Sequence, residues 1–423
     1  MNKILLFLCV LLFATLGCVE IPEPFSKIPP GLWKGTLVLE DDPLTNRNDL
    51  ELPFNFEVNY GENDAILITI INAEERIVIE EVKFTHNRRT GRDSIFIDFP
   101  LFDTHIAAEF KENIIQGAWH VHYRDNYSIP FIAYHGNHNR FEMLDDANHD
   151  LSGEWNVRME IETETEYPAL GDFKQEGNKL TGTFLTETGD YRYLEGVVSG
   201  NELFLSCFDG SHAFYFDGEV LNSGSILGRF YSGVHYKTNW TGVKDGNNDM
   251  SNAYEFSKLK RNKDPVSFSF PNTEGLQVSL SDEKYRDKPK IIKLMGTWCP
   301  NCMDETNFLL DYLKNNPDKQ IDIIAIAFER YRDPQKALQM VEQYKTKKQI
   351  PYEVLYGGYY DKAEATETFK ILEKIQSYPT LIFLNSKNEV QKIYTGFAGP
   401  ATKEYQNFKV DFDRIVTELL NEV

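Results

Sequence analysis

The stretch Gly296-Thr297-Trp298-Cys299-Pro300-Asn301-Cys302 decides the fold and chemistry of the C-terminal part of this chain. It follows the largely apolar run 291–295 and precedes a segment with helical periodicity, so both cysteines are predicted where a buried strand ends and a helix begins. Helix N-terminal amides favour a thiolate over a thiol, and a second cysteine one helical turn later can resolve a mixed disulfide formed by the first. The stretch therefore predicts a reactive dithiol.

A Cys-x-x-Cys pair can also be half of a zinc site, which needs four ligands. All nine histidines precede Tyr236, and no cysteine other than the pair follows it. His120 and His122 share one face of a predicted strand, but they lack a carboxylate or cysteine at ligand spacing and are interpreted as surface residues. We expect no metal and no organic cofactor, only a redox-active disulfide between Cys299 and Cys302.

Strand-like and helix-period segments alternate after residue 264. Asp333-Pro334 supplies a helix N-cap and first-turn proline, and Asn316-Pro317 ends the helix that carries Cys302. Alternation of this kind predicts an α/β sandwich around a mixed sheet for residues 265–423. The predicted strands are 290–296, 321–328, 352–356, 380–384 and 390–394, and the predicted helices are 301–315, 334–347, 363–374 and 403–420.

Three motifs of this domain match a known family. They are Trp298-Cys299-Pro300-Asn301-Cys302 at the strand-to-helix junction, Tyr378-Pro379-Thr380 before a strand, and the Thr395-Gly396-Phe397 turn before the last helix. With them the domain resembles the thioredoxin superfamily, most closely its membrane-tethered TlpA/ResA-like thiol-disulfide oxidoreductases. The resemblance covers residues 265–423 and does not extend to the rest of the chain.

The resemblance implies roles for five residues. Cys299 would be the attacking cysteine and Cys302 the resolving one, and the first should be the more exposed. Pro379 would be a cis-proline against the disulfide, which leaves the backbone of Tyr378 free to pair with a substrate chain. Trp298 is expected to shield the thiols and to offer apolar contact to a partner.

Lys293 departs from the family's pattern, which commonly has Asp, Asn or Gln six residues before the first cysteine. A buried unpaired ammonium is costly, so Lys293 should be neutral or paired if it lies beneath the disulfide. Our hypothesis is that Lys293 pairs with Glu329 at the end of the next strand and sets the pKa of Cys302; the alternative places both side chains at the surface. Asp304 and Glu305 are interpreted as ordinary helix-stabilising acids.

Upstream, residues 31–236 consist of short alternating runs broken by Gly, Asn and Asp, which predicts antiparallel β structure. Gly31-Leu32-Trp33 corresponds to Gly153-Glu154-Trp155, so we predict two copies of one all-β module. Each resembles a small up-and-down barrel such as the lipocalin-like folds, interpreted as a spacer or docking unit rather than a ligand carrier. The predicted segments are β module 1 (31–143), β module 2 (151–243) and a linker (244–264).

The N-terminus has the pattern of an exported lipoprotein. Residues 1–17 combine a basic start with an apolar core too short to span a bilayer, as in a signal peptide. Thr15-Leu16-Gly17-Cys18 resembles a bacterial lipobox, which predicts lipidation of Cys18 and a tether over residues 18–30. Thr15 replaces the usual leucine, so the alternative is a secreted protein with a free Cys18. With the lipid anchor, we expect the protein in the cell envelope, in the periplasm or at the outer surface.

Composition narrows the function further. The net charge of -21 argues against nucleic acid as a partner. Besides the reactive pair, the exported chain keeps only Cys18 and Cys207, so no structural disulfide framework is expected, and Cys207 is interpreted as a buried inert thiol. We expect an envelope thiol-disulfide oxidoreductase whose partners are protein disulfides or thiols and an upstream membrane reductant.

Two alternatives stay open. A thiol peroxidase on the same fold is disfavoured because Thr297-Trp298-Cys299 lacks the proline and the threonine spacing that cradle a peroxide in peroxiredoxins. A surface ligand-binding lipoprotein with an accessory thioredoxin-like domain is disfavoured because Cys299, Cys302 and Pro379 are all present.

Overall fold

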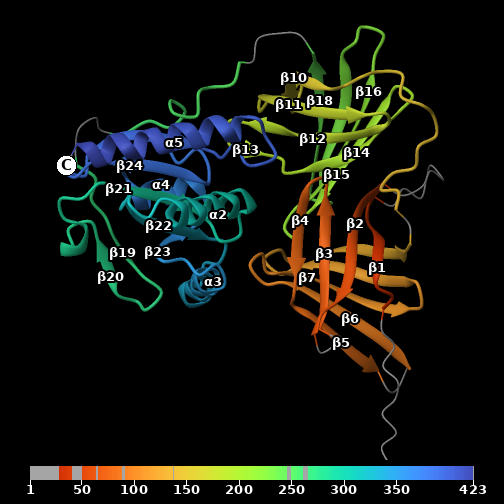
Figure 1. Ribbon diagram of the computed structural model, residues 1–423, viewed down its shortest axis with the longest axis horizontal. Helices are drawn as coiled ribbons and strands as arrows, with labels where there is room; N and C mark the ends of the chain where they lie inside the picture. The colour runs from red at the N-terminus through yellow and green to blue at the C-terminus, as the bar shows by residue number, and fades with distance from the viewer. Residues whose placement is uncertain are drawn as a thin grey trace, which may run out of the picture.

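The structure is a computed structural model that describes residues 28–40, 50–62, 65–87, 91–136, 138–244, 249–260 and 265–422. The predicted signal peptide, the lipidation site Cys18 and the tether up to residue 27 lie outside the described residues. In the part that is described, no helix is both long and apolar enough to cross a membrane. Figure 1 shows two β bodies stacked on one another, with an α/β domain beside them.

β module 1 is a single antiparallel sheet in the order β4-β3-β2-β1-β9-β8-β7-β6-β5. Strand β3 buries every second residue, as the alternating sequence predicts for a sheet with one face in the core. The sheet curls, but β4 and β5 remain its edges, so the barrel-like prediction holds only as a half-barrel. The strands are β1 (Gly31–Glu40), β2 (Leu50–Tyr60), β3 (Ile66–Asn72), β4 (Glu75–Ile79), β5 (Val82–Asn87), β6 (Arg92–Phe99), β7 (Thr104–Lys111), β8 (Ile114–Val121) and β9 (Tyr127–His135).

β module 2 is a closed barrel. Its strands follow the order β11-β10-β18-β17-β16-β15-β14-β12, and β11 pairs with β12 to close the ring. Aromatic side chains fill the interior, with ring centroids 4.4 Å apart for Phe184 and Phe216 and 4.3 Å apart for Phe216 and Phe230. The strands are β10 (Gly153–Met159), β11 (Tyr167–Glu176), β12 (Lys179–Thr186), β13 (Gly189–Asp190), β14 (Leu194–Ser199), β15 (Glu202–Phe208), β16 (Ala213–Val220), β17 (Ile226–Ser232) and β18 (Tyr236–Val243).

Both β modules begin with the same local geometry. Gly31 and Gly153 have φ values of 107° and 104°, which only glycine adopts without strain. In each module the tryptophan two residues later donates its indole N–H to the carbonyl four residues before it, at 3.0 Å for Trp33 and 2.8 Å for Trp155. Ile28 is fully buried in module 1, so residues 28–30 belong to that module and not to the tether as predicted.

The C-terminal domain is built on a mixed sheet in the order β23-β22-β21-β24-β25. β21 pairs in parallel with β22 and antiparallel with β24, so it is the central strand, and all its residues are buried. The elements are β19 (Ser269–Pro271), β20 (Gln277–Ser279), β21 (Lys290–Met295), α2 (Pro300–Asn315), β22 (Asp322–Glu329), α3 (Pro334–Lys347), β23 (Glu353–Tyr359), α4 (Lys362–Phe369), β24 (Thr380–Leu384), β25 (Val390–Thr395) and α5 (Glu404–Asn421).

These elements confirm the predicted α/β order, with two differences. Helix α4 ends at Phe369 rather than 374, because Lys370 turns the chain into the left-handed region at φ 53°. The predicted linker is not a free connection: its described part, 249–260, packs along the C-terminal domain, where the Lys260 N–H donates to the Ile371 carbonyl at 2.9 Å. The linker also contacts the barrel, where the Ser251 N–H donates to Glu187 Oε1 at 2.8 Å.

Candidate active site

The two cysteines lie at the junction of β21 and α2, as predicted. Cys299 is the N-cap of α2, and its Sγ accepts a hydrogen bond from the backbone N–H of Cys302 at 3.2 Å. Both cysteines are free thiols. Cys299 is 7% exposed and Cys302 is fully buried, so Cys299 is the more exposed of the two, as expected. Even so, little of the Cys299 side chain is accessible to a substrate.

The two thiols have opposite acidities. Burial alone would raise the pKa of Cys299, but hydrogen bonds from the Cys302 thiol and backbone N–H outweigh it, and the charges of Lys293 and Arg330 add to them, so its pKa lies below the ordinary value. Burial, the hydrogen bond to Cys299 and the charge on Cys299 raise the pKa of Cys302 well above it. One thiol is therefore prepared as a thiolate while the other keeps its proton.

The Tyr378–Pro379 peptide bond is cis, as the resemblance implies. The Tyr378 carbonyl oxygen lies 3.6 Å from Cys299 Sγ and accepts its hydrogen while the thiol is protonated. Trp298 covers the same side: its indole N–H donates to the Phe328 carbonyl at 2.9 Å, and its ring meets that of Tyr378 edge to face at 6.0 Å. The three predicted supporting residues therefore surround the attacking cysteine.

Lys293 is buried and paired, but its partner is not Glu329 as predicted. Its Nζ lies 3.2 Å from Glu305 Oε2, and it donates to the Cys302 carbonyl at 2.8 Å and to the Thr306 hydroxyl at 2.7 Å. Both Lys293 and Glu305 are completely buried. Glu305 is thus not an ordinary surface acid: burial, only partly offset by Lys293, raises its pKa to about 7.

Glu329 holds the other side of the dithiol loop. Its carboxylate accepts from the Thr297 backbone N–H at 3.0 Å and from the Thr297 hydroxyl at 2.8 Å. Burial raises its pKa to about 7, against the opposing effects of these hydrogen bonds and of Arg330. Two buried glutamates therefore flank the active-site turn, one beneath Cys302 and one beneath Thr297.

The sequence prediction missed Glu305, although a signal for it exists. Cys302, Glu305, Thr306 and Leu309 recur at helical spacing on α2, and all four are buried. The position of Glu305 in that stripe points its side chain inward rather than to solvent. The prediction also missed Arg330, whose guanidinium lies 4.4 Å from the Trp298 ring centroid.

Both β modules contact the active-site face of the C-terminal domain. Arg330 lies between Trp298 and Tyr123 of module 1, 3.8 Å from the Tyr123 ring centroid. On the barrel side, Asn301, inside the Cys-x-x-Cys motif, donates through Nδ2 to the Asp190 carbonyl at 3.1 Å. The Ser377 hydroxyl, next to the cis-proline, donates to the Thr188 carbonyl at 2.8 Å. The dithiol therefore lies at the meeting point of three bodies.

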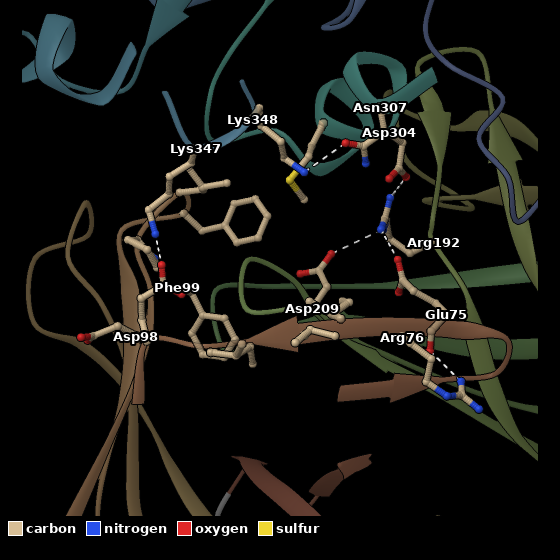
Figure 2. Close-up of a pocket in the computed structure, with 18 residues that line it drawn as sticks. Glu75, Arg76, Asp98, Phe99, Arg192, Asp209, Asp304, Asn307, Lys347 and Lys348 are labelled. Atoms are coloured by element: carbon tan, nitrogen blue, oxygen red, sulfur yellow. Dashed lines mark hydrogen bonds and ion pairs between the residues drawn. The ribbon is translucent and has the colours of Figure 1, made fainter. Parts of the chain in front are cut away.

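Arg192 of the barrel joins these bodies through charge. Its guanidinium contacts Asp304 of α2, Glu75 of module 1 at 2.5 Å and Asp209 of the barrel at 3.5 Å (Figure 2). The first-turn acid Asp304 is thus an interdomain contact. A cavity of about 400 Å³ opens beside the cluster, between module 1 and α2. Lys348 lines it and donates to Asn307 Oδ1 at 3.0 Å (Figure 2).

The described residues contain no group of three or more His, Cys, Asp or Glu arranged to hold a metal ion. His120 on β8 stacks on His105 on β7, with ring centroids 4.9 Å apart, and both side chains are half-buried. Cys207 is completely buried in β15, and burial together with the nearby acids Asp209 and Glu75 raises its pKa well above the ordinary value. The inert reading of Cys207 fits this environment.

A family model described as the AhpC/TSA family matches residues 262–393. A curated protein of Haemophilus influenzae described only as uncharacterized is 25% identical over 142 residues, 31% of this chain and 84% of its own. The chain is similar to the solved thiol:disulfide interchange protein, a thioredoxin family protein, of Chlorobium tepidum TLS (24% identity, 38% of this chain, 97% of that one, TM-score 0.29). It is also similar to a thiol-disulfide oxidoreductase of Bacteroides fragilis (19% identity, 35% and 98%, TM-score 0.27). The family match and the sheet order support a thioredoxin-like redox domain.

Proposed function

We propose that this protein is a cell-envelope thiol-disulfide oxidoreductase that reduces disulfides of exported proteins. One observation carries the proposal: at a helix start beside a cis-proline, the pKa of the Cys299 thiol is lowered while that of Cys302 is raised. A dithiol divided in this way has a ready nucleophile and a protected resolving group.

The reaction exchanges one disulfide for another. The Cys299 thiolate attacks a substrate disulfide, an S–S bond forms to Cys299, and the second substrate sulfur leaves as a thiolate that takes a proton. Cys302 then loses its proton and attacks Cys299 Sγ, which forms the Cys299–Cys302 disulfide and releases the first substrate sulfur. The substrate is reduced by two electrons and the protein is oxidised by two, so a dithiol reductant must restore it.

Lys293 and Glu305 tune this exchange. The Lys293 charge lowers the pKa of both cysteines, and Glu305 opposes that charge when it ionises. Because the pKa of Glu305 is about 7, the pair changes its net charge near neutral pH. Glu329 acts separately by fixing Thr297, one residue before the Trp-Cys motif.

The location and partners complete the proposal. Lipidation of Cys18 would tether the chain to a membrane, and its substrates would be protein disulfides while a membrane dithiol protein would supply electrons. The β modules, 31–143 and 151–243, are proposed as two copies of one unit, supported by their shared Gly-x-Trp opening. Their proposed role is to hold the redox domain rather than to carry a ligand, since aromatic rings fill the barrel interior.

The test is reduction of insulin by the mature chain in the presence of dithiothreitol. Cys302→Ser should lower turnover. In a parallel incubation with insulin but without dithiothreitol it should accumulate a mixed disulfide with the substrate, because Cys299 can attack but no thiol resolves the product. Cys299→Ser is the matched control and should trap nothing. Trapping through residue 302 instead, or rapid peroxide consumption without insulin reduction, would contradict the proposal.

A further inference from the structure

The face of the redox domain that must meet a protein substrate is covered by its own barrel. The turn between β12 and β13 lies against the cis-proline loop and the start of α2. Its fit is close: a Cβ on Gly189 would come within 2.3 Å of Asn301 Nδ2, and a Cβ on Gly396 within 2.9 Å of the Glu187 carbonyl oxygen. Residues 187–190 are called the masking turn below.

The contacts to the masking turn are those that a polypeptide would receive. Ser377 Oγ donates to one backbone carbonyl, of Thr188, and Asn301 Nδ2 donates to a second, of Asp190. The Gly399 N–H donates to the Asp190 carboxylate at 2.7 Å. Two carbonyls and one carboxylate are therefore bound by donors that lie around the dithiol, one of them inside the Cys-x-x-Cys motif.

A mixed disulfide cannot form on this arrangement of the three bodies. It needs a substrate sulfur within bonding distance of Cys299 Sγ, about 2 Å. Cys299 is only 7% exposed, and Trp298 on its other side is covered by Arg330 and Tyr123 of module 1. A polypeptide can reach the sulfur only when the β modules move away from the redox domain.

Ion pairs hold the β modules against the redox domain. They lie around buried Arg192 and at the edge of the interface. Arg192 links Asp304 of α2 to both β modules, and Lys347 of α3 pairs with Glu81 of module 1. Polar interfaces within a chain resemble transient contacts and permit relative domain motion. Only open molecules can bind a substrate. The apparent affinity is therefore the affinity of the open state multiplied by the fraction of molecules that are open.

We infer that the donors Ser377, Asn301 and Gly399 form a polypeptide-binding site beside the dithiol, and that the masking turn occupies it as an internal competitor. The partner that fits is a protein disulfide flanked by an extended backbone and a carboxylate side chain, which would replace Thr188 and Asp190. The inference rests on the proposed function, because the competitor matters only if Cys299 attacks protein disulfides.

The test compares small and large thiol reagents on the mature chain. Cys18, Cys207 and Cys302 are replaced by Ser, so that only Cys299 reacts, and its rates are measured with iodoacetamide and with a maleimide on a long polyethylene glycol chain. Asp304→Arg places a cation against Arg192 and should open the interface. Asp311→Arg, at an exposed position of the same helix, is the matched control.

Asp304→Arg should raise the ratio of the large-reagent rate to the small-reagent rate about tenfold, with Asp311→Arg unchanged. The ratio cancels any change in thiolate fraction, since both reagents use the same sulfur. A second opening variant, Lys347→Glu, should act in the same direction but less, and Lys347→Glu/Glu81→Lys should restore the original ratio. Small-angle scattering should show a larger maximum dimension for Asp304→Arg at unchanged circular dichroism.

Equal ratios in the parent and both opening variants would overturn the inference. In chains that retain Cys302, Asp304→Arg should lower the KM for insulin and leave kcat nearly unchanged, and adding Ser377→Ala should raise that KM again. If the ratio rises as expected but no variant reduces insulin, the masking stands and the proposed function fails. If insulin is reduced with equal ratios, the function stands and the masking fails.

Discussion

Cys299 and Cys207 are both buried thiols with charged groups around them, yet their acidities are opposite. Around Cys207, Arg192 and Arg140 lower the pKa and Asp209 and Glu75 raise it, but burial dominates and the pKa is raised well above its usual value. Around Cys299, burial also raises the pKa, but hydrogen bonds to the sulfur outweigh it and the pKa is lowered. The two sites therefore separate the effect of nearby charge from that of directed hydrogen bonds.

What distinguishes Cys299 is its position at the start of α2. It is the N-cap, so the backbone N–H of Cys302 points at its sulfur, and the thiol of Cys302 donates as well. Cys207 lies within strand β15, whose backbone donors are engaged with the strands beside it. Nearby cations alone do not make a buried cysteine reactive; donors aimed at the sulfur do.

The largest expected effect is on activity, and it tests the difference between Cys299 and Cys207. Cys299→Ser should lower insulin reduction by at least about 10³-fold, because no other thiol can replace a missing nucleophile. Cys207→Ser, which changes a thiol of similar burial, should stay within about twofold of the original rate at equal folded fraction. Loss of activity in Cys207→Ser with an intact circular dichroism spectrum would contradict the comparison.

The next effect concerns the buried pair beneath Cys302. Lys293→Met leaves the Glu305 carboxyl buried without its cation, and we expect unfolding free energy to fall by about 3–5 kcal/mol in urea titrations. Lys293→Met/Glu305→Leu removes both charges and should recover most of that loss. The pKa of Cys299, measured from the pH dependence of its alkylation rate (its alkylation pKa), should rise in both variants, because the Lys293 charge is absent from both. A double variant no more stable than the single one would show that the pair is not coupled.

The pH dependence of stability follows from Glu305. Burial raises its pKa from 4.5 to about 7, so the folded chain keeps a proton that the unfolded chain releases. The contribution of Glu305 is therefore complete below pH 4.5 and is lost as the pH rises through about 7, a fall of about 3 kcal/mol.

Glu305→Gln should flatten the fall in unfolding free energy between these pH values, measured by urea titration at each pH. The pKa of Glu329 is raised in the same direction, so Glu305→Gln/Glu329→Gln should flatten the fall further than Glu305→Gln alone. A slope unchanged by Glu305→Gln would show that its carboxyl is not the titrating group.

The smallest effect concerns Arg330. Its guanidinium is one of the weaker influences that lower the pKa of Cys299, so Arg330→Met should raise the alkylation pKa by a fraction of a unit. Arg332→Met, where the side chain is 66% exposed and pairs with Glu364, is the control and should leave that pKa unchanged. If both variants shifted the pKa of Cys299 equally, the shift would come from long-range charge and not from the contact of Arg330 with the site.

The sequence predicted the redox domain well because its signals are local. Helix α3 and strand β24 have the predicted bounds, since an Asp-Pro cap starts one and a proline precedes the other. The resemblance to the thioredoxin superfamily implied the order of exposure of the two cysteines and the cis-proline. The lysine partner was wrong, because the choice between Glu305 and Glu329 depends on which face of α2 turns inward.

Features that depend on contacts between distant parts of the chain were harder to predict from the sequence. The closure of module 2 and the open edge between β4 and β5 in module 1 depend on pairings between strands far apart, which alternation does not specify. The masking of the dithiol depends on contacts such as Arg192 with Asp304, which are 112 residues apart. No periodicity or motif links two such positions, so docking of the three bodies could come only from the structure.

The most direct measurement is the pH dependence of alkylation of all three cysteines in one folded chain. Mature protein with Cys18→Ser is reacted briefly with iodoacetamide across a pH series, and the labelled peptides are quantified by mass spectrometry. Cys299 should label with an apparent pKa below the ordinary thiol value of 9.0, and Cys302 and Cys207 should stay unlabelled well above it. Labelling of Cys207 at or below the pH at which Cys299 reacts would contradict the account.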